Sequence, residues 1–151
     1  LNDKFKSYSL LSILSLVNLS IVEGQKINEF YKNVKDVVVI LESQKHWITF
    51  FCEWLFKLLQ LIGYQIDYKN KKDCKYFNLI TQDFENSNIE NSIVFPHKLL
   101  AHRSKISFKE INAIFTIFES VYKRNHLDNM NFKMPNSFIN FKKSLLRQLK
   151  S

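Results

Sequence analysis

The composition of this 151-residue chain sets limits on its fold and its partners. Hydrophobic residues make up 46% of the chain, enough for the core of one domain, whereas only 2 glycines and 2 prolines are present. Because an all-β fold needs a turn about every ten residues, this shortage of turn residues disfavours it. Two cysteines are too few for a disulfide framework or an all-cysteine zinc site, and we expect a reduced, cytoplasmic protein.

The net charge of +8 is concentrated in the last third of the chain. Residues 1–97 contain 11 Lys/Arg and 11 Asp/Glu, whereas residues 98–151 contain 11 Lys/Arg and 3 Asp/Glu. Such an asymmetry indicates an anionic partner, which would be nucleic acid, an acidic peptide or a membrane surface. The alternative is a basic surface that only keeps the protein soluble.

The first 62 residues predict three helices, at about 3–22, 28–42 and 45–62. In the first, Leu10, Leu14, Val17 and Ile21 have helical spacing and are the expected buried stripe, which Leu11, Ile13 and Leu16 widen. The uncharged stretch 7–22 also resembles the apolar part of a signal peptide, which leaves a targeting segment as the alternative. It falls short of the roughly 20 apolar residues that a membrane-spanning helix needs.

The second and third helices are predicted from the same spacing. The β-branched run 37–40 favours a strand, but the helical spacing of Tyr31, Val34, Val38 and Leu41 outweighs it. The third helix is the most hydrophobic part of the chain and the expected centre of the fold. We expect Gly63 to end it in the left-handed conformation.

The remainder of the chain predicts a small irregular insertion and further helices. Residues 76–84 suit one or two short strands, and 85–92 read as a loop. A helical turn follows at 95–100, a helix begins at the capping box of Ser107 and Glu110, and a last helix covers 137–150. The predicted fold is therefore mainly α: a single domain at 1–151, a bundle of about five to six helices with a short β-like insertion around 76–84.

Residues with chemistry of their own form no catalytic pattern. The isolated Gly24 and Gly63 exclude a glycine-rich phosphate loop. Cys74 could pair with a distant histidine as a nucleophile, or join His46, His97, His102 and His126 in a zinc site, but no ligand spacing supports either. We therefore expect a binding module that is not an enzyme and holds neither metal nor cofactor.

The candidate binding residues are basic and lie in the last third of the chain. Tyr64, Tyr68 and Tyr76 could add stacking on nucleic-acid bases. The basic candidates for contact with DNA or a protein partner are Lys98, Arg103, Lys105, Lys123, Arg124, Lys143, Arg147 and Lys150.

Residues 54–67, WLFKLLQLIGYQID, resemble a pattern of the RecO family of DNA-repair recombination mediators. That pattern places an aromatic residue before a Leu-Leu pair, an apolar-Gly-aromatic step and an Asp. Weaker motifs agree in order over residues 8–150: Val22-Glu23 before a helix, then Cys74, a short β segment at 76–84, Phe95-Pro96, and Met134-Pro135 before the last helix.

The resemblance implies a function in recombination and the repair of DNA damage. Members carry an oligonucleotide-binding barrel (OB-fold) before the helical domain, and because this chain starts at Leu1 rather than Met we expect a fragment that lacks it. The family binds single- and double-stranded DNA and promotes annealing. With the partner RecR it loads RecA onto strands coated by single-stranded-DNA-binding protein, whose acidic, Phe-ending tail binds the helical domain.

Three departures from the family pattern concern its binding groups. Glu53 and Leu55 stand where many members have Arg and Glu, which puts tail binding by that surface in doubt, and Phe138 replaces a basic residue. The four-cysteine zinc site of some members cannot form. Two alternatives to a recombination mediator are a stand-alone helical adaptor that binds an acidic partner without nucleic acid, and an enzyme fragment that lacks its catalytic half.

Overall fold

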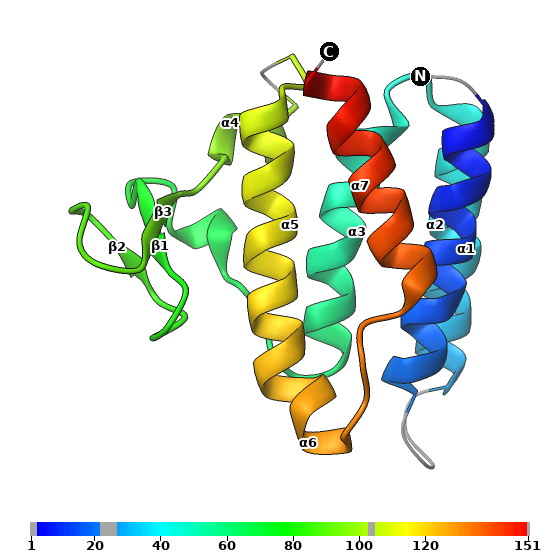
Figure 1. The fold of residues 1–151 in the computed structure, drawn as a ribbon, viewed down its shortest axis with the longest axis horizontal. Helices are drawn as coiled ribbons and strands as arrows, with labels where there is room; N and C mark the ends of the chain where they lie inside the picture. The colour runs from blue at the N-terminus through cyan, green and yellow to red at the C-terminus, as the bar shows by residue number, and fades with distance from the viewer. Residues whose placement is uncertain (1–2, 22–26, 103–104, 151) are drawn as a thin grey trace.

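The computed structural model describes residues 3–21, 27–102 and 105–150, and shows the mainly helical bundle that the sequence predicts (Figure 1). Five long helices build the bundle: α1 (Asp3–Ser20), α2 (Ile27–Ser43), α3 (Trp47–Leu61), α5 (Phe108–Tyr122) and α7 (Asn136–Lys150). The short elements are a 3-10 turn (Tyr68–Asn70), α4 (His97–Leu100), a π-helical turn (Lys123–Leu127) and α6 (Asp128–Met130). No helix of the described residues is both long and apolar enough to cross a membrane.

A small antiparallel sheet projects from one side of the bundle, between α3 and α4 (Figure 1). Its strands are β1 (Tyr76–Asn78), β2 (Phe84–Glu85) and β3 (Ser92–Val94), in the order β2-β1-β3. The predicted strands within 76–84 are confirmed in position. The insertion extends further than predicted, because β3 follows the Asn/Ser/Glu segment and pairs Ile93 with Phe77 across the sheet.

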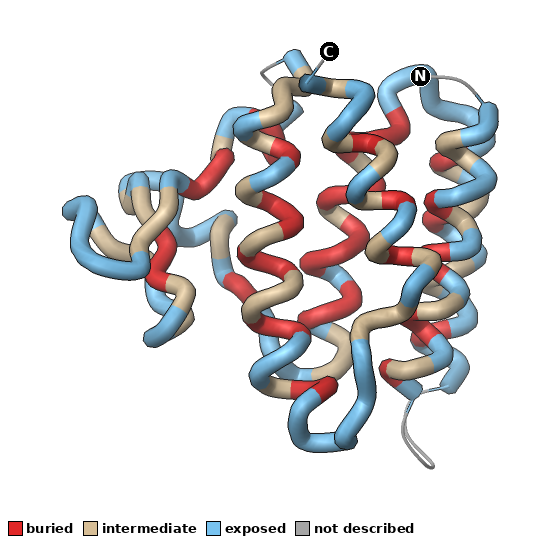
Figure 2. Tube along the Cα trace, in the orientation of Figure 1, coloured by how far each residue is buried: buried red, intermediate tan, exposed pale blue. Residues whose placement is uncertain are grey.

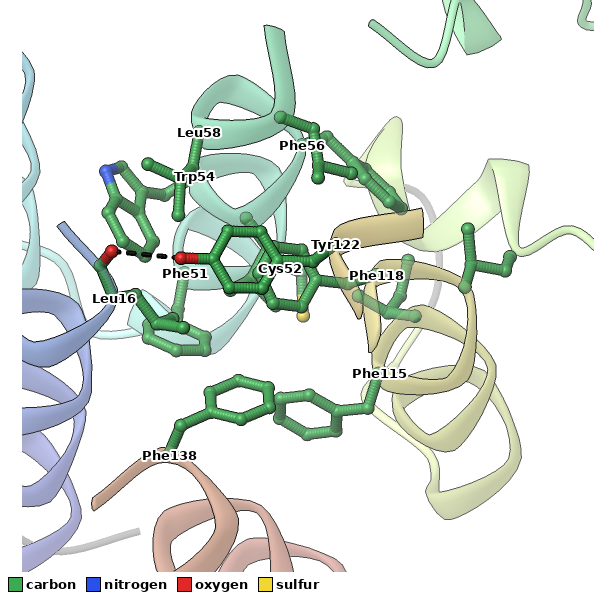
Figure 3. Close-up of a cluster of buried hydrophobic side chains, with 14 of the residues drawn as sticks. Leu16, Phe51, Cys52, Trp54, Phe56, Leu58, Phe115, Phe118, Tyr122 and Phe138 are labelled. Carbon is green, nitrogen blue, oxygen red and sulfur yellow. Dashed lines mark hydrogen bonds between the residues drawn. The ribbon is translucent and has the colours of Figure 1, made fainter. Parts of the chain in front are cut away.

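The core is centred on α3, as predicted, and is rich in aromatic rings. Phe51 of α3 is fully buried, and its ring centroid lies 5.0 Å from that of Phe141 in α7, at an edge-on angle. Phe115 of α5 makes a similar contact with Phe138 of α7 at 5.6 Å (Figure 3). Figure 2 shows the buried residues along α3 and on the inner faces of α5 and α7. These edge-on contacts add to the burial of apolar area and fix how the three helices pack.

The buried face of α1 differs from the predicted stripe. Leu14 is 56% exposed and Ile21 is 37% exposed, and of the four residues of the stripe only Val17 is buried. Of the three residues predicted to widen it, Ile13 and Leu16 are buried and Leu11 is exposed. The buried face is made of serines and aliphatic residues: Ser9, Ser12, Ile13, Leu16, Val17 and Ser20. Ser9 and Ser20 can be buried because their hydroxyls donate to carbonyls of their own helix, to Lys6 O at 2.6 Å and to Leu16 O at 2.7 Å. The buried Ser12 hydroxyl has no hydrogen-bond partner among the described residues.

The predicted helix caps agree with the structure where it describes them. Gly63 has a φ of 95°, in the left-handed region that glycine adopts at little cost, and it follows the end of α3. The Ser107 hydroxyl accepts a hydrogen bond from the backbone N–H of Glu110 at 3.3 Å and begins α5. Gly24 lies outside the described residues. Ser107 therefore fixes where α5 starts, beside which three of the eight candidate basic residues lie: Lys98, Lys105 and Lys150.

Candidate nucleic-acid interface

The candidate basic residues separate into groups at opposite ends of α5. Lys98 in α4, Lys105 before α5 and Lys150 at the end of α7 lie where α5 begins (Figure 1). Lys143 and Arg147 are exposed farther back along α7. Lys123 and Arg124 lie at the other end, in the π-helical turn. Arg103 lies outside the described residues.

We call the first group, together with Lys109, the basic end. Its four lysines, Lys98, Lys105, Lys109 and Lys150, are all exposed. Lys150 reaches back to the start of α5, where its Nζ lies 5.9 Å from the ring centroid of Phe108. The first turn of α5 adds a partial positive charge from its unpaired backbone N–H groups. Three separate segments therefore bring positive charge to one end of the bundle.

The basic end has no acidic counter-charge within bonding distance among residues 3–21, 27–102 and 105–150. The ion pairs of these described ranges all lie outside the basic end: they join Lys123 to Asp128, Lys142 to Glu119 and His102 to Glu53. Glu110, the nearest acid in sequence, has its carboxylate 3.1 Å from the hydroxyl of its own capping residue, Ser107. The positive charge of the basic end is therefore available to an external anion.

Lys109 was not among the individual residues singled out from the sequence. It belongs to the basic end because the Ser107 cap places it in the first turn of α5, on the side of Lys98. The sequence signal that could have found it is the cap itself, since the cap fixes which residues lie in the first turn.

The opposite end of α5 uses its basic residues within the fold. Lys123 Nζ lies 3.2 Å from Asp128, and Arg124 Nη1 donates to Ile80 O at 3.0 Å. Next to them, Asn125 Nδ2 donates to Gln82 Oε1 at 2.8 Å. These contacts tie the end of α5 to the turn between β1 and β2. Arg124 therefore has a structural role that its sequence position does not reveal.

The same end of α5 is also tied to α1 by buried polar groups. The hydroxyl oxygens of Tyr122 and Ser20 are 2.8 Å apart, and Tyr122 also donates to Leu16 O at 3.2 Å (Figure 3). His126 Nε2 lies 2.6 Å from Leu19 O. Burial raises the pKa of Tyr122 to about 12, while the bond to Ser20 acts in the opposite direction. We call this group, from Tyr122 to Asp128, the pinned end.

The surface of α3 that the resemblance associates with tail binding is acidic here. Glu53 lines a pocket of about 440 Å³ together with Asp36 and Asp67, and with Lys57 and Lys69 as the basic groups. The Glu53 carboxylate contacts His102 Nε2. Leu55 is fully buried and cannot contact a partner. The pocket is thus poorly matched to an acidic peptide.

Most of the tyrosine and cysteine side chains singled out from the sequence pack against other residues of the fold. Tyr68 packs between Phe56 and Phe95, and burial, with Glu53 nearby, raises its pKa. Tyr64 is exposed, and Lys75 lies over the ring of Tyr76 at 5.6 Å. Burial raises the pKa of the Cys52 thiol, so it is an unreactive core residue. No group of three or more potential metal ligands occurs among the described residues.

No family model, no curated protein and no solved structure matches this chain.

Proposed function

We propose that this chain is the helical part of a RecO-like recombination mediator, which binds DNA through the basic end and supports strand annealing and RecA loading. The observation that carries the proposal is the convergence of Lys98, Lys105, Lys109 and Lys150 from three segments on one end of the bundle, with no acid paired to them in the described part of the chain. The order of the elements along the chain supports the proposal too. A small sheet follows the segment 54–67 that resembles the family, as it does in the order of motifs that the resemblance implies.

The chemistry of the basic end suits a phosphate backbone better than specific bases. Lysine is a flexible point charge, and the four lysines offer charge without a planar fork to read base edges. Binding should therefore be insensitive to sequence and strongly dependent on salt. Each phosphate neutralised on a single strand contributes about 0.7 to the log–log salt slope, so four contacts give a slope of about 2.8.

RecR and the tail of single-stranded-DNA-binding protein enter the proposal as partners of the complete protein. The α3 pocket argues against that surface as the tail site, because Asp36, Glu53 and Asp67 would repel an acidic peptide. DNA contact by the basic end does not depend on the tail.

Fluorescence anisotropy with a labelled single-stranded oligonucleotide tests the proposal. The variant changes all four lysines of the basic end to glutamine. The matched control removes the same charge elsewhere, by changing the exposed Lys32, Lys35, Lys71 and Lys72 to glutamine. We expect the first variant to lose affinity by about 600-fold at roughly 0.1 M salt, about fivefold for each of four contacts, and the control by only a few-fold. Equal losses would show that net charge, and not the basic end, holds the DNA.

A further inference from the structure

A cleft of about 640 Å³ lies between the strand β3 with α4 on one side and α5 on the other. Ile93, Val94 and Pro96 line the first wall, and Ala113 and Thr116 line the second. Lys98 and Lys109, both exposed, contribute one lysine from each wall. Asn112 and Glu110 also line the second wall, and the Glu110 carboxylate lies 3.1 Å from the Ser107 hydroxyl. The cleft thus has an aliphatic part and carries one lysine on each wall against a single carboxylate.

The strand beside this cleft is an edge strand. On its open side Ser92 N–H already donates to Ile89 O at 3.1 Å, so the backbone of Val94 is the part that can pair with another strand. In the β1–β3 ladder, Phe95 N–H donates to Lys75 O and Leu79 N–H donates to Asn91 O, each at 2.9 Å. These bonds make Lys75–Phe95 and Leu79–Asn91 hydrogen-bonded pairs of the ladder. Because hydrogen-bonded and non-bonded pairs alternate in an antiparallel ladder, the neighbouring pair Tyr76–Val94 is non-bonded. The N–H and C=O of Val94 therefore point away from β1, toward the open side of β3.

We propose that the cleft binds an extended peptide segment that adds to the open edge of β3 as a fourth strand. The peptide backbone pairs with Val94, one apolar side chain fills the space between Pro96 and Ala113, and acidic side chains meet Lys98 and Lys109. Main-chain bonds supply affinity in this mode of recognition, and the alternate side chains supply specificity. The proposal goes beyond DNA binding and does not rest on it.

The lining favours a peptide over a nucleic acid. Binding of unpaired bases needs an exposed aromatic face on which they can stack. Phe95, the aromatic side chain in the lining, is only 3% exposed. The ring of His97 is packed against Phe95 at 4.7 Å, and its Nε2 is held 2.7 Å from Cys74 O. An aliphatic side chain of a peptide matches the remaining surface.

The probe is a labelled peptide in which glutamate and valine alternate, and its binding is followed by anisotropy at moderate salt. Two control peptides are used: one has lysine in place of glutamate, and the other has N-methyl groups that block strand pairing. We expect the first peptide to bind and both controls to bind at least about tenfold more weakly. No binding of the glutamate–valine peptide, or equal binding of its N-methylated form, would overturn the proposal.

Protein variants locate the site. Val94→Pro removes the outward N–H at an edge position where proline is tolerated, and Ala113→Trp fills the cleft. Lys98→Glu with Lys109→Glu reverses the charge, with Lys32→Glu and Lys35→Glu as the matched control. We expect the first three changes each to weaken peptide binding about tenfold or more, and the control to have little effect.

The same variants separate this proposal from DNA binding. Val94→Pro and Ala113→Trp keep all four lysines of the basic end, so DNA affinity should be unchanged while peptide affinity falls. Thermal unfolding of each variant confirms that it is folded. If Ala113→Trp reduced oligonucleotide affinity and left peptide affinity unchanged, the cleft would be part of the nucleic-acid site and the peptide proposal would be wrong.

Discussion

The two ends of α5 carry similar basic residues and use them differently. At the basic end, Lys98 and Lys109 are exposed and form no ion pair with a described residue. At the pinned end, Lys123 is paired with Asp128, and Arg124 donates to backbone carbonyls of the sheet insertion. Lysines and arginines of the same chain thus differ in availability, because among the described residues the fold brings an acid or carbonyl groups to Lys123 and Arg124 but pairs no acid with the lysines of the basic end.

This difference separates stability from binding along a single helix. The pinned end joins α5 to α1 through Tyr122 and to the sheet through Arg124. The side chains in contact at the basic end are less buried: Phe108, for example, lies under Lys150 and is only half-buried. Changes at the pinned end should therefore lower stability, whereas changes at the basic end should lower anion binding.

The largest effect is expected from Tyr122→Ala, at the pinned end. Removing a fully buried aromatic ring should lower the free energy of unfolding by about 3–5 kcal/mol, measured by urea denaturation. Phe108→Ala at the basic end is the comparison, and it should cost about 1 kcal/mol because the ring is only half-buried. Similar losses for both would show that the two ends are equally packed.

The next effect is expected from Tyr122→Phe, which keeps the ring and removes the hydroxyl. Ser20 keeps its bond to Leu16 O, so the loss should be about 1–2 kcal/mol. The variant should also change the alkaline limit of stability. Because burial raises the pKa of Tyr122 to about 12 from the ordinary 10.0, the contribution of its neutral form is complete below pH 10.0 and is lost as the pH rises toward 12. In Tyr122→Phe, stability should fall less steeply over that range; an unchanged slope would contradict the assignment.

A smaller effect compares single lysines from the two ends. Lys109→Gln should weaken binding of single-stranded DNA about fivefold at roughly 0.1 M salt, the loss of one phosphate contact. Lys123→Gln removes the same charge from a residue already paired with Asp128 and should change the affinity by less than about twofold. Anisotropy titrations of both variants measure the difference. A greater loss from Lys123→Gln would move the DNA site to the pinned end.

The smallest effect is expected from Arg124→Gln. It removes hydrogen bonds to Ile80 O and Leu79 O, and since the side chain is exposed the loss of stability should be about 0.5 kcal/mol. Amide exchange should detect it more sensitively, as faster exchange confined to the β1–β2 turn. Exchange that increased throughout the bundle instead would mean that Arg124 supports the global fold.

Much of this fold could be predicted because its signals are local. The apolar spacing of α3 and the cap at Ser107 lie within single helices, and both are confirmed. The buried face of α1 could not be predicted by ranking hydrophobicity: Leu14 is exposed, whereas Ser9 and Ser20 are buried and donate to carbonyls of α1. A serine that bonds to its own helix loses little on burial, and a hydrophobicity pattern does not record such bonds.

The parts that could not be predicted depend on contacts between distant segments. β3 forms where Ile93 pairs with Phe77 of the predicted strand segment, whereas the residues before it, 85–92, read as a loop in the sequence. In the same way, Arg124 and Lys98 are equally basic in sequence, and only the contact of Arg124 with Ile80, 44 residues away, separates their roles. The candidate residues were thus predicted as a set, but their division between two ends required the fold.

The salt dependence of DNA binding tests the central claim most directly. The logarithm of the association constant for single-stranded DNA is measured against the logarithm of salt concentration for the unchanged chain, the basic-end variant and the matched control. The slope should be about 2.8 units shallower in the variant in which Lys98, Lys105, Lys109 and Lys150 are glutamine, and close to unchanged in the control. Equal slopes for the variant and the unchanged chain would contradict the assignment of DNA binding to the basic end.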